Sequence, residues 1–225
     1  WSRGFRLPTY ADLFYRDFRV QGRADLLPET SLNREFGLTW TLQNPWQFSV
    51  DASRFHYSID NMIVWRMGNF QVFSPYNTDA RVHGEEVSVQ TEIPSSRVQI
   101  HAHYMHMRSI NKNKNITLFD NHLPYRPKHT VKAGVSVQYP DWHSRLNARF
   151  VGERFLNEAN TKQLPGYTVL DLTTSYTLHI RQTRLTLHLQ INNLLDEHYQ
   201  IIRDMPMPPR EWRLGLEYSL NPNLF

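Results

Sequence analysis

Strict alternation of apolar and polar residues is the feature that most constrains the fold of this chain. In 185–192 the odd positions are apolar and the even positions polar, whereas in 211–220 the apolar residues hold the even positions. Successive side chains of a β-strand point to opposite faces, so each segment predicts a strand with one apolar and one polar face. The same period recurs in 35–42, 86–93, 98–104, 131–139, 145–150 and 170–178. No segment shows a helical stripe of apolar residues, so we predict an all-β protein.

The stretch 46–64 changes phase along its length. It starts with Phe48, Val50 and Ala52 on one face and then continues with Phe55 and Tyr57 on the other. An extra residue in one strand of a pair would produce such a change, so the sequence predicts a β-bulge at the slip.

Short and long connections alternate between the predicted strands. The tight turns lie at 44–46, 94–96, 139–142 and 179–182, and the long connections at 7–30, 66–80, 109–128, 153–166 and 195–210. In an up-and-down meander, alternate connections lie at opposite ends, so one end carries tight turns and the other long loops. This asymmetry is typical of an antiparallel, up-and-down transmembrane β-barrel of the outer membrane.

The side chains of the two faces favour a lipid environment over a soluble core. Aromatic residues stand where strands meet turns, as the interfacial girdles of barrels require; they are Trp46, Tyr139, Trp142, Trp212 and Tyr218. The polar face is rich in charges, which a wet or plugged lumen tolerates. The mean hydropathy of −0.57 agrees with this interpretation, because only every second strand residue of a barrel meets lipid.

Composition excludes several other classes of protein. The chain has no cysteine, which removes disulfides, Cys-ligated zinc and thiol catalysis. No run approaches the 18 apolar residues of a spanning helix. The net charge of +4 comes from 25 scattered basic and 21 acidic residues, and gives no argument for nucleic-acid binding. The segment Gly134-Val-Ser-Val-Gln138 lacks the closing glycine of a nucleophile elbow, and Glu85 and Glu86 point to opposite faces, so we predict no enzyme.

Four motifs resemble those of the TonB-dependent outer-membrane receptors, in the C-terminal part of their barrel. Phe-Arg-Leu-Pro-Thr at 5–9 with Asp-Leu-Phe-Tyr at 12–15 is similar to the family's Phe-Arg-Ala-Pro…Leu-Tyr box. Ala-Asp-Leu-Leu-Pro-Glu-Thr-Ser at 24–31 resembles its Asn-Pro-x-Leu-x-Pro-Glu box. Ile-Asn-Asn-Leu-Leu-Asp-Glu-His-Tyr at 191–199 resembles the end of the penultimate strand. The run 207–216 resembles the entry to the last strand, with Pro209 in place of Gly, and the chain ends in Phe225, as the family's barrels do.

This resemblance implies a 22-stranded barrel around a plug. Residues 1–225 would form its C-terminal part, with about the last ten strands, of which Trp1 to Arg6 represents the first. We therefore expect a piece of a receptor whose plug and earlier strands lie elsewhere. The resemblance also implies the outer membrane of a Gram-negative bacterium and uptake of a ferric siderophore, cobalamin or similar chelate. The implied partners are the plug, TonB, outer-membrane lipid and the chelate, with no nucleic acid and no cofactor.

Ligand contacts are expected on the long loops, because rigid strands position loop residues for binding. Aromatic and basic side chains there suit a bulky, often anionic chelate. The candidates are Tyr10, Tyr15, Arg16, Trp65, Phe70, Phe73, Tyr76, Phe119, His122 and Tyr125. For each of them the alternative is packing against a neighbouring aromatic residue or anchoring at the membrane interface.

A histidine- and methionine-rich segment offers a weaker metal candidate. His101 and His103 share a strand face with Met105 and Met107, and such side chains can hold a soft metal or haem iron. Hydrogen bonding in the lumen is the competing explanation for the histidines. Haem receptors of the family tend to carry a histidine between the first two motifs, and none stands between Thr9 and Leu27.

Two further classes stay open at this point. A passive porin would have similar strands, although the motifs near 5–8 and 26–31 argue against it. A soluble β-rich binding domain would also show alternation, since the pattern alone indicates only half-buried strands.

Overall fold

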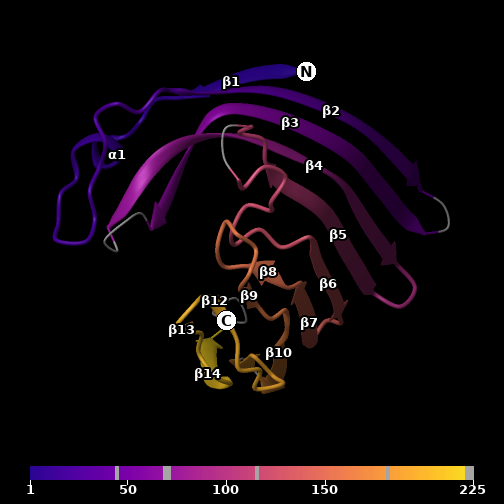
Figure 1. The fold of residues 1–225 in the computed structure, drawn as a ribbon. Helices are drawn as coiled ribbons and strands as arrows, with labels where there is room; N and C mark the ends of the chain where they lie inside the picture. The colour runs from indigo at the N-terminus through magenta and orange to yellow at the C-terminus, as the bar shows by residue number, and fades with distance from the viewer. Residues whose placement is uncertain (44–45, 68–71, 115–116, 181–182, 221–225) are drawn as a thin grey trace.

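Ten strands form one antiparallel sheet in the computed structural model, which describes residues 1–220 except 44–45, 68–71, 115–116 and 181–182 (Figure 1). Each strand of the sheet pairs with the next one along the chain, so the sheet is an up-and-down meander. The strands are β1 (Ser2–Arg6), β2 (Glu29–Leu42), β3 (Gln47–Met67), β4 (Phe73–Ile93), β5 (Val98–Asn111), β6 (His129–Gln138), β7 (Trp142–Val151), β10 (Tyr167–Ile180), β11 (Thr183–Asn192) and β14 (Glu211–Leu220). The predicted all-β meander and its ten strands are confirmed.

The remaining elements are short and lie in the long connections. Helix α1 (Tyr10–Phe14) lies between β1 and β2, the ribbon β8 (Arg154–Phe155) and β9 (Gln163–Leu164) between β7 and β10, and the ribbon β12 (Gln200–Ile202) and β13 (Met205–Pro206) between β11 and β14. No helix among the described residues is long and apolar enough to cross a membrane.

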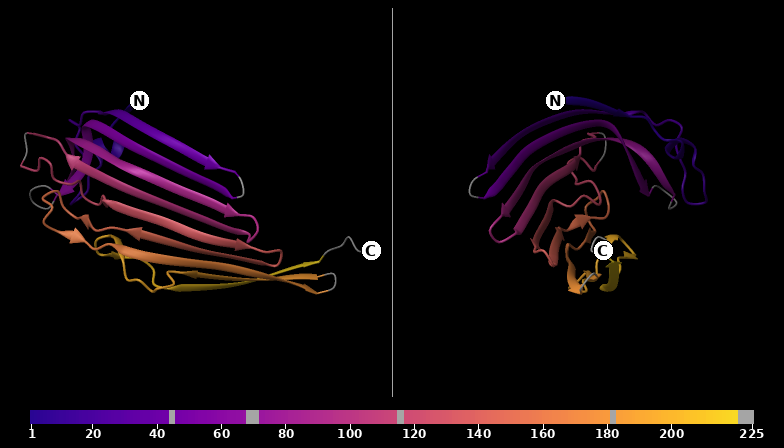
Figure 2. Two further views of the ribbon diagram at one scale, coloured as in Figure 1. Left: turned by 90° about the vertical axis from the view of Figure 1, so that its right-hand side faces the viewer. Right: turned by 180° about the vertical axis from the view of Figure 1, so that it is seen from behind.

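The sheet curls into an arc whose two outer strands, β1 and β14, do not pair with each other (Figure 1). The tight turns lie at one end of the strands and the long connections at the other (Figure 2). The loop-bearing end is called the loop end below, and the opposite end the turn end. The predicted turn segments 44–46 and 179–182 lie partly outside the described residues, and Phe225 lies outside them.

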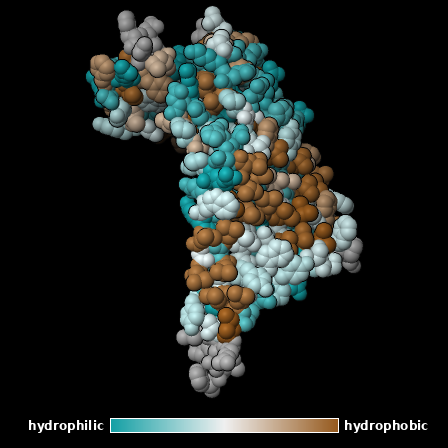
Figure 3. All heavy atoms as spheres, turned by 90° about the horizontal axis from the view of Figure 1, so that it is seen from below, coloured by the Kyte–Doolittle hydropathy of each residue, from teal (hydrophilic) through white to brown (hydrophobic). Residues whose placement is uncertain are grey.

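The strand register converts the alternating sequence into one continuous apolar band. Val50 pairs with Val89, which pairs with Ala102, and the row continues through Ala133 and Ala148 to Leu170. The next row joins Ile100, Val135, Leu146, Leu172 and Ile191. Figure 3 shows the molecule from below, which exposes the outside of the arc at the last strands. Hydrophobic residues gather on this surface, and hydrophilic ones prevail near the loop end. This outer face leaves large apolar side chains uncovered, Leu214 at 84%, as a lipid-facing wall requires.

Strands β3 and β4 extend far beyond the apolar band. Each has 21 residues, or about 70 Å of extended chain at ~3.3 Å per residue. The apolar band of such barrels is only ~25 Å tall. The predicted long loop at 66–80 is therefore wrong, because Phe73 to Ala80 continues β4. Sequence alternation could not reveal this extension, since the parts of both strands nearest the loop end have no continuous apolar face.

The bulge predicted in the stretch 46–64 is present, but it does not lie at the phase slip between Ala52 and Phe55. The β2–β3 register runs unbroken from Thr30 opposite Asp60 to Leu42 opposite Phe48. Phe55 therefore turns to the inner face, where it is 6% exposed and stacks on Tyr57 at a centroid distance of 5.2 Å. The phase slip thus marks the level along β3 at which the outer face changes from apolar to charged. Beyond this level the large aromatic residues lie on the inner face.

The actual irregularity lies further along β3. The β3–β4 register shifts between Ile59 and Met62, and Asn61 adopts a left-handed backbone with φ of 57°, which asparagine tolerates better than most residues. The backbone N–H of Asn61 donates to Asp79 Oδ1 at 3.2 Å, and its carbonyl accepts from Asn77 Nδ2 at 2.7 Å. These two side chains satisfy the backbone groups that the bulge removes from the ladder.

An added charge should reduce stability on the outer face of β5 but not on its inner face. Ile100→Arg on the outer band should destabilise the full-length protein in lipid vesicles by about 2–4 kcal/mol, because the charge would lie in hydrocarbon. Gln99→Arg is the matched control, since residue 99 faces inward opposite Glu92. Urea titration of the protein in phosphatidylcholine vesicles measures the difference. Equal destabilisation by the two substitutions would contradict the assigned faces.

Candidate functional site at the loop end

The connection between β1 and β2 is fixed against the tip of the β3–β4 hairpin. Thr9 caps α1: its N–H donates to Asp12 Oδ2 at 2.9 Å, and the N–H of Asp12 donates back to Thr9 Oγ1 at 3.2 Å. The indole Nε1 of Trp65 in β3 donates to the other carboxylate oxygen of Asp12 at 2.9 Å. Asp12 is 4% exposed, so this buried carboxylate ties the helix to β3.

The electrostatics of Asp12 favour its charged form. Burial on its own raises the pKa of this carboxyl, but the hydrogen bonds from Thr9 and Trp65 and the charge of Arg6 outweigh it, so the pKa of Asp12 lies below its usual 3.8. A carboxylate that accepts several hydrogen bonds is stabilised in this way. The anchor is therefore fully charged at neutral pH.

A second contact of the same connection brings two arginines to the ring of one tyrosine. The guanidinium carbon of Arg66 lies 4.1 Å and that of Arg23 4.6 Å from the ring centroid of Tyr76. Such cation–π contacts are attractive and orient the guanidinium groups. Arg23 also forms an ion pair with Asp25, while Arg66 contacts Glu158 at 3.4 Å in the β7–β10 connection. We call Arg23, Tyr76 and Arg66 the arginine–tyrosine stack.

Glu158 links this stack to a second group of loop residues. Its backbone carbonyl accepts from Asn121 Nδ2 at 2.9 Å. The neighbouring His122 is held by Asn160, which accepts from its N–H at 2.7 Å and donates to its carbonyl at 2.9 Å. Three connections, at 7–28, 112–128 and 152–166, and the β3–β4 tip thus form one hydrogen-bonded cluster at the loop end.

His122 itself is partly buried against Phe155, with ring centroids 5.6 Å apart. Burial first, and then the charges of Lys128 and Arg108, lower the pKa of His122 below 6.5. The imidazole is therefore neutral at physiological pH, so it can donate or accept a hydrogen bond but adds no positive charge to the cluster.

The structure brings together some of the residues that the sequence suggested. Trp65 and Phe73 stack at a centroid distance of 5.7 Å, and both lie in strands beside Tyr76 rather than in a loop as predicted. The polar, proline-containing run from Ser74 to Asp79 does not alternate, so the sequence carries no strand signal there. Paired strands can carry such residues where no face needs to be apolar.

The other candidates are more peripheral. Tyr10 is 79% exposed and lies 5.3 Å from Phe14, and Tyr15 and Arg16 are exposed at the end of α1. Phe119 lies 4.8 Å from Lys112 Nζ, and the N–H of Tyr125 donates to the carbonyl of Phe155. Phe70 lies outside the described residues.

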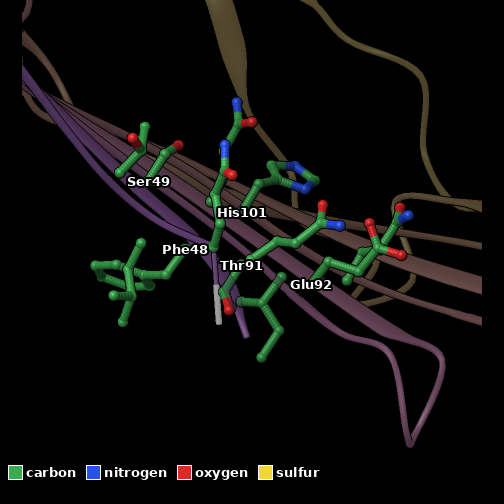
Figure 4. Close-up of a pocket in the computed structure, with 12 residues that line it drawn as sticks. Phe48, Ser49, Thr91, Glu92 and His101 are labelled. Atoms are coloured by element: carbon green, nitrogen blue, oxygen red, sulfur yellow. The ribbon is translucent and has the colours of Figure 1, made fainter. Parts of the chain in front are cut away.

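The histidine pair of β5 lies away from this cluster, toward the turn end. His103 Nδ1 is 2.9 Å from Ser88 Oγ, and His101 lies against Gly134, where a Cβ would approach its ring to 2.3 Å. A hollow beside His101 is lined by residues of β2 to β5, with His101 and Ser49 on one side of the strands and Phe48 on the other (Figure 4). In the described part of the chain no group of three or more His, Asp or Glu side chains could hold a metal ion.

Sequence reasoning missed the polar residues that organise the cluster. The three residues lie far apart in the sequence: Arg23 in the β1–β2 connection, Arg66 in β3 and Glu158 in the β7–β10 connection. The contact between Arg66 and Glu158 joins positions 92 residues apart. A capping pattern was present, because Thr9 precedes Asp12 by three residues. It could have located α1, but not Trp65 as the partner of Asp12.

An antiparallel meander with an apolar outer band, tight turns at one end and long connections at the other defines the class of transmembrane β-barrels. The family model described as "TonB dependent receptor-like, beta-barrel" matches residues 1–194, and the chain belongs to this family. The family consists of receptors, so the prediction that the protein is not an enzyme is confirmed.

Relatives and solved structures agree with this assignment. The chain is 29% identical over 201 residues to the vitamin B12 transporter BtuB of Photobacterium profundum, covering 87% of the chain and 30% of that protein. It is 24% identical to BtuB of Vibrio vulnificus, covering 97% and 33%. The chain thus spans about a third of the length of these relatives. The copper transporter OprC (TM-score 0.72, 18% identity, covering 97% of the chain and 36% of OprC) and the ferric-catecholate import receptor Fiu from E. coli K12 (0.69, 22%, covering 97% and 32%) share its fold.

Removing the buried anchor should release the β1–β2 connection. Asp12→Ala leaves the Trp65 indole and the Thr9 N–H without their acceptor, a loss of about 1–3 kcal/mol. We expect trypsin to cut the full-length protein after Arg16 or Arg19 roughly tenfold faster, as local opening becomes more frequent. Tyr10→Phe, a change in an exposed side chain of the same helix, is the control. Unchanged cleavage of the Asp12 variant would contradict the anchoring role.

The anchor should also depend on pH in one direction. Because the folded pKa of Asp12 is lowered, its stabilisation is complete above the usual value of 3.8 and is lost as the pH falls through the lowered pKa. The indole N–H resonance of Trp65, followed by NMR, should stay constant from about pH 8 to 5 and shift below pH 3.8. Asp12→Asn should abolish this titration. A midpoint above the usual value would contradict the assigned hydrogen bonds.

Proposed function

We propose that the protein is an outer-membrane active-transport receptor that takes up a scarce chelate, with energy delivered through TonB. The observation that carries this proposal is the loop cluster built around the arginine–tyrosine stack, which lies above a lipid-facing barrel wall. A rigid wall that holds aromatic and guanidinium groups at its outer end suits capture of a bulky anionic ligand. Membership of the receptor family supports the same function and does not favour a passive porin.

The chain itself would supply the C-terminal part of the barrel wall and five of the loops. Its match to about a third of two B12 transporters supports this placement. The unpaired edges of β1 and β14 support it too, because hydrocarbon does not tolerate unpaired backbone groups and further strands would have to cover them. A plug domain within the complete barrel, TonB and outer-membrane lipid are the remaining proposed partners.

Cobalamin and ferric siderophores are the two ligand classes to test. The sequence relatives are named as vitamin B12 transporters, which favours cobalamin. Several receptors of the same fold are named for ferric ligands, and the cationic stack also suits the carboxylates or catecholates of such chelates. Both ligands are large and carry negative groups that arginine can bind.

Uptake by cells distinguishes the two ligands. A strain that lacks the gene should lose uptake of labelled cobalamin, or growth on one ferric siderophore under iron limitation, and plasmid copies should restore it. A companion strain without TonB should show the same loss. Normal uptake of every tested chelate in the deletion strain would contradict the proposal.

The stack should contribute to ligand affinity directly. In the full-length receptor, Tyr76→Ala removes the ring that both guanidinium groups contact, and we expect Kd for the transported ligand to rise about tenfold, or ~1.4 kcal/mol. Arg97→Gln is the control, because Arg97 lies 5.6 Å from the Tyr139 ring in a similar pair at the turn end. Equilibrium binding to the detergent-solubilised receptor provides the measurement. Equal Kd values for wild type and Tyr76→Ala would contradict a role of the stack in binding.

A further inference from the structure

A group of basic residues occupies the outer face of the sheet immediately beyond the apolar band. Along β3 the outer positions change from Val50 and Ala52 to Arg54 and His56. The register continues this change on the neighbouring strands β2, β4 and β5. We call the six side chains Arg34, Arg54, His56, Arg81, His83 and Arg108 the outer basic patch.

The patch is compact, and its arginines are exposed. His56 and His83 are register partners whose rings stack at a centroid distance of 6.1 Å. Arg34, Arg54 and Arg81 lie near enough to His56 to act on its charge, and Arg108 acts on His83. All four arginines are exposed, Arg54 with 77% of its side chain.

Acidic groups compensate only part of this charge. Glu85 contacts Arg54 at 3.8 Å and His106 at 3.1 Å. Asp120 is near Arg81 and Arg108 but pairs with Lys112. Among the described residues, no hydrogen bond or ion pair engages the guanidinium groups of Arg34, Arg81 or Arg108. Within the part of the chain that the structure describes, these three arginines therefore face outward without an internal partner.

The rest of the wall lacks such a patch. The outer positions of β7, β10, β11 and β14 carry only apolar, hydroxyl or aromatic residues, among them Phe150, Thr168, Ile191 and Trp212. A general need for solubility above the membrane would distribute charges around the barrel. Arg3 of β1, opposite Leu32, lies on the same face, so the arginines are confined to β1–β5. This confinement instead indicates a local binding partner.

The position of the patch indicates the chemistry of that partner. Side chains just beyond the apolar band of a barrel lie at the depth of lipid headgroups. Guanidinium groups bind phosphate with paired hydrogen bonds. Arg34 to Arg108 spans four adjacent strands, or roughly 14 Å at ~4.8 Å per strand spacing, which exceeds the size of a single phosphate. We propose that the outer basic patch binds the headgroup of a membrane lipid that carries more than one phosphate.

A second copy of the chain fits this surface less well. Two such patches facing each other across a two-fold axis would bring like charges together, which is unfavourable. A lipid headgroup supplies the negative charge and continues the contact that the acyl chains make with Val87 and Tyr104 below. Lipid binding by the outer basic patch requires the membrane location that is part of the proposed function. It does not depend on which ligand the receptor transports.

Native mass spectrometry of the full-length receptor in neutral detergent tests this proposal with bis-phosphorylated lipid A as the probe. We expect one retained lipid A, and at least a tenfold weaker affinity in Arg34→Gln/Arg81→Gln/Arg108→Gln. The matched control is Arg145→Gln/Arg184→Gln/Arg213→Gln, which removes the same charge from the inner face of β7, β11 and β14. This control should bind as wild type does. Mono-phosphorylated lipid A should bind more weakly, and inorganic phosphate at equal concentration should not compete.

Three results would overturn the proposal: equal lipid binding by the outer-face variant, an equal loss in the inner-face control, or displacement of the lipid by inorganic phosphate. The triple lysine variant of the outer patch covers the case in which the glutamine variant does not fold. The lysine variant keeps the charge but loses the planar guanidinium fork. It should therefore bind lipid A more weakly than wild type and the inner-face control, and more tightly than the glutamine variant. Unchanged ligand transport alongside lost lipid binding would separate this inference from the proposed function.

Discussion

The structure depends on pairing every strand with its chain neighbour while one face of the sheet remains apolar. Backbone N–H and C=O groups cannot be left unpaired in hydrocarbon, so a wall that faces lipid must be a continuous ladder. The same ladder fixes the register, and a one-residue slip would turn the apolar residues inward. Rows such as Val89, Ala102 and Ala133 exist only because every hairpin keeps this register.

The ladder also explains how the sheet can extend beyond its apolar band. Strands β3 and β4 continue their hydrogen bonds past the apolar band, and only their side chains change. Beyond the band, the large apolar residues Phe55 and Tyr57 lie on the inner face of β3, while Arg54 and His56 lie on its outer face. One pair of strands thus carries an apolar segment, a basic segment and the tip against which the loops pack.

The sequence was a sufficient guide to the wall and a poor one to the loop end. Alternation is a local property, so the ten strands and the order of tight turns could be predicted from it. The extent of β4 could not, because from Ser74 to Asp79 no face is held against a single solvent and the residues do not alternate. The phase slip at Phe55 was visible, but a bulge and a change of environment produce the same pattern in one strand. Only the partner register distinguishes them.

The loop cluster shows why residues that meet from several connections are harder to predict than the wall that supports them. Tyr76 was identifiable as an aromatic residue near a loop, yet its surroundings come from Arg23 in one connection and Arg66 in another strand. Glu158 joins from a third connection, so the arrangement exists only after the hairpins have aligned. Because the strands hold these loops at fixed positions, single buried groups such as Asp12 can determine the position of a whole connection. The strands thus fix the positions at which the groups of the cluster meet, and they also carry two members of the stack, Arg66 and Tyr76.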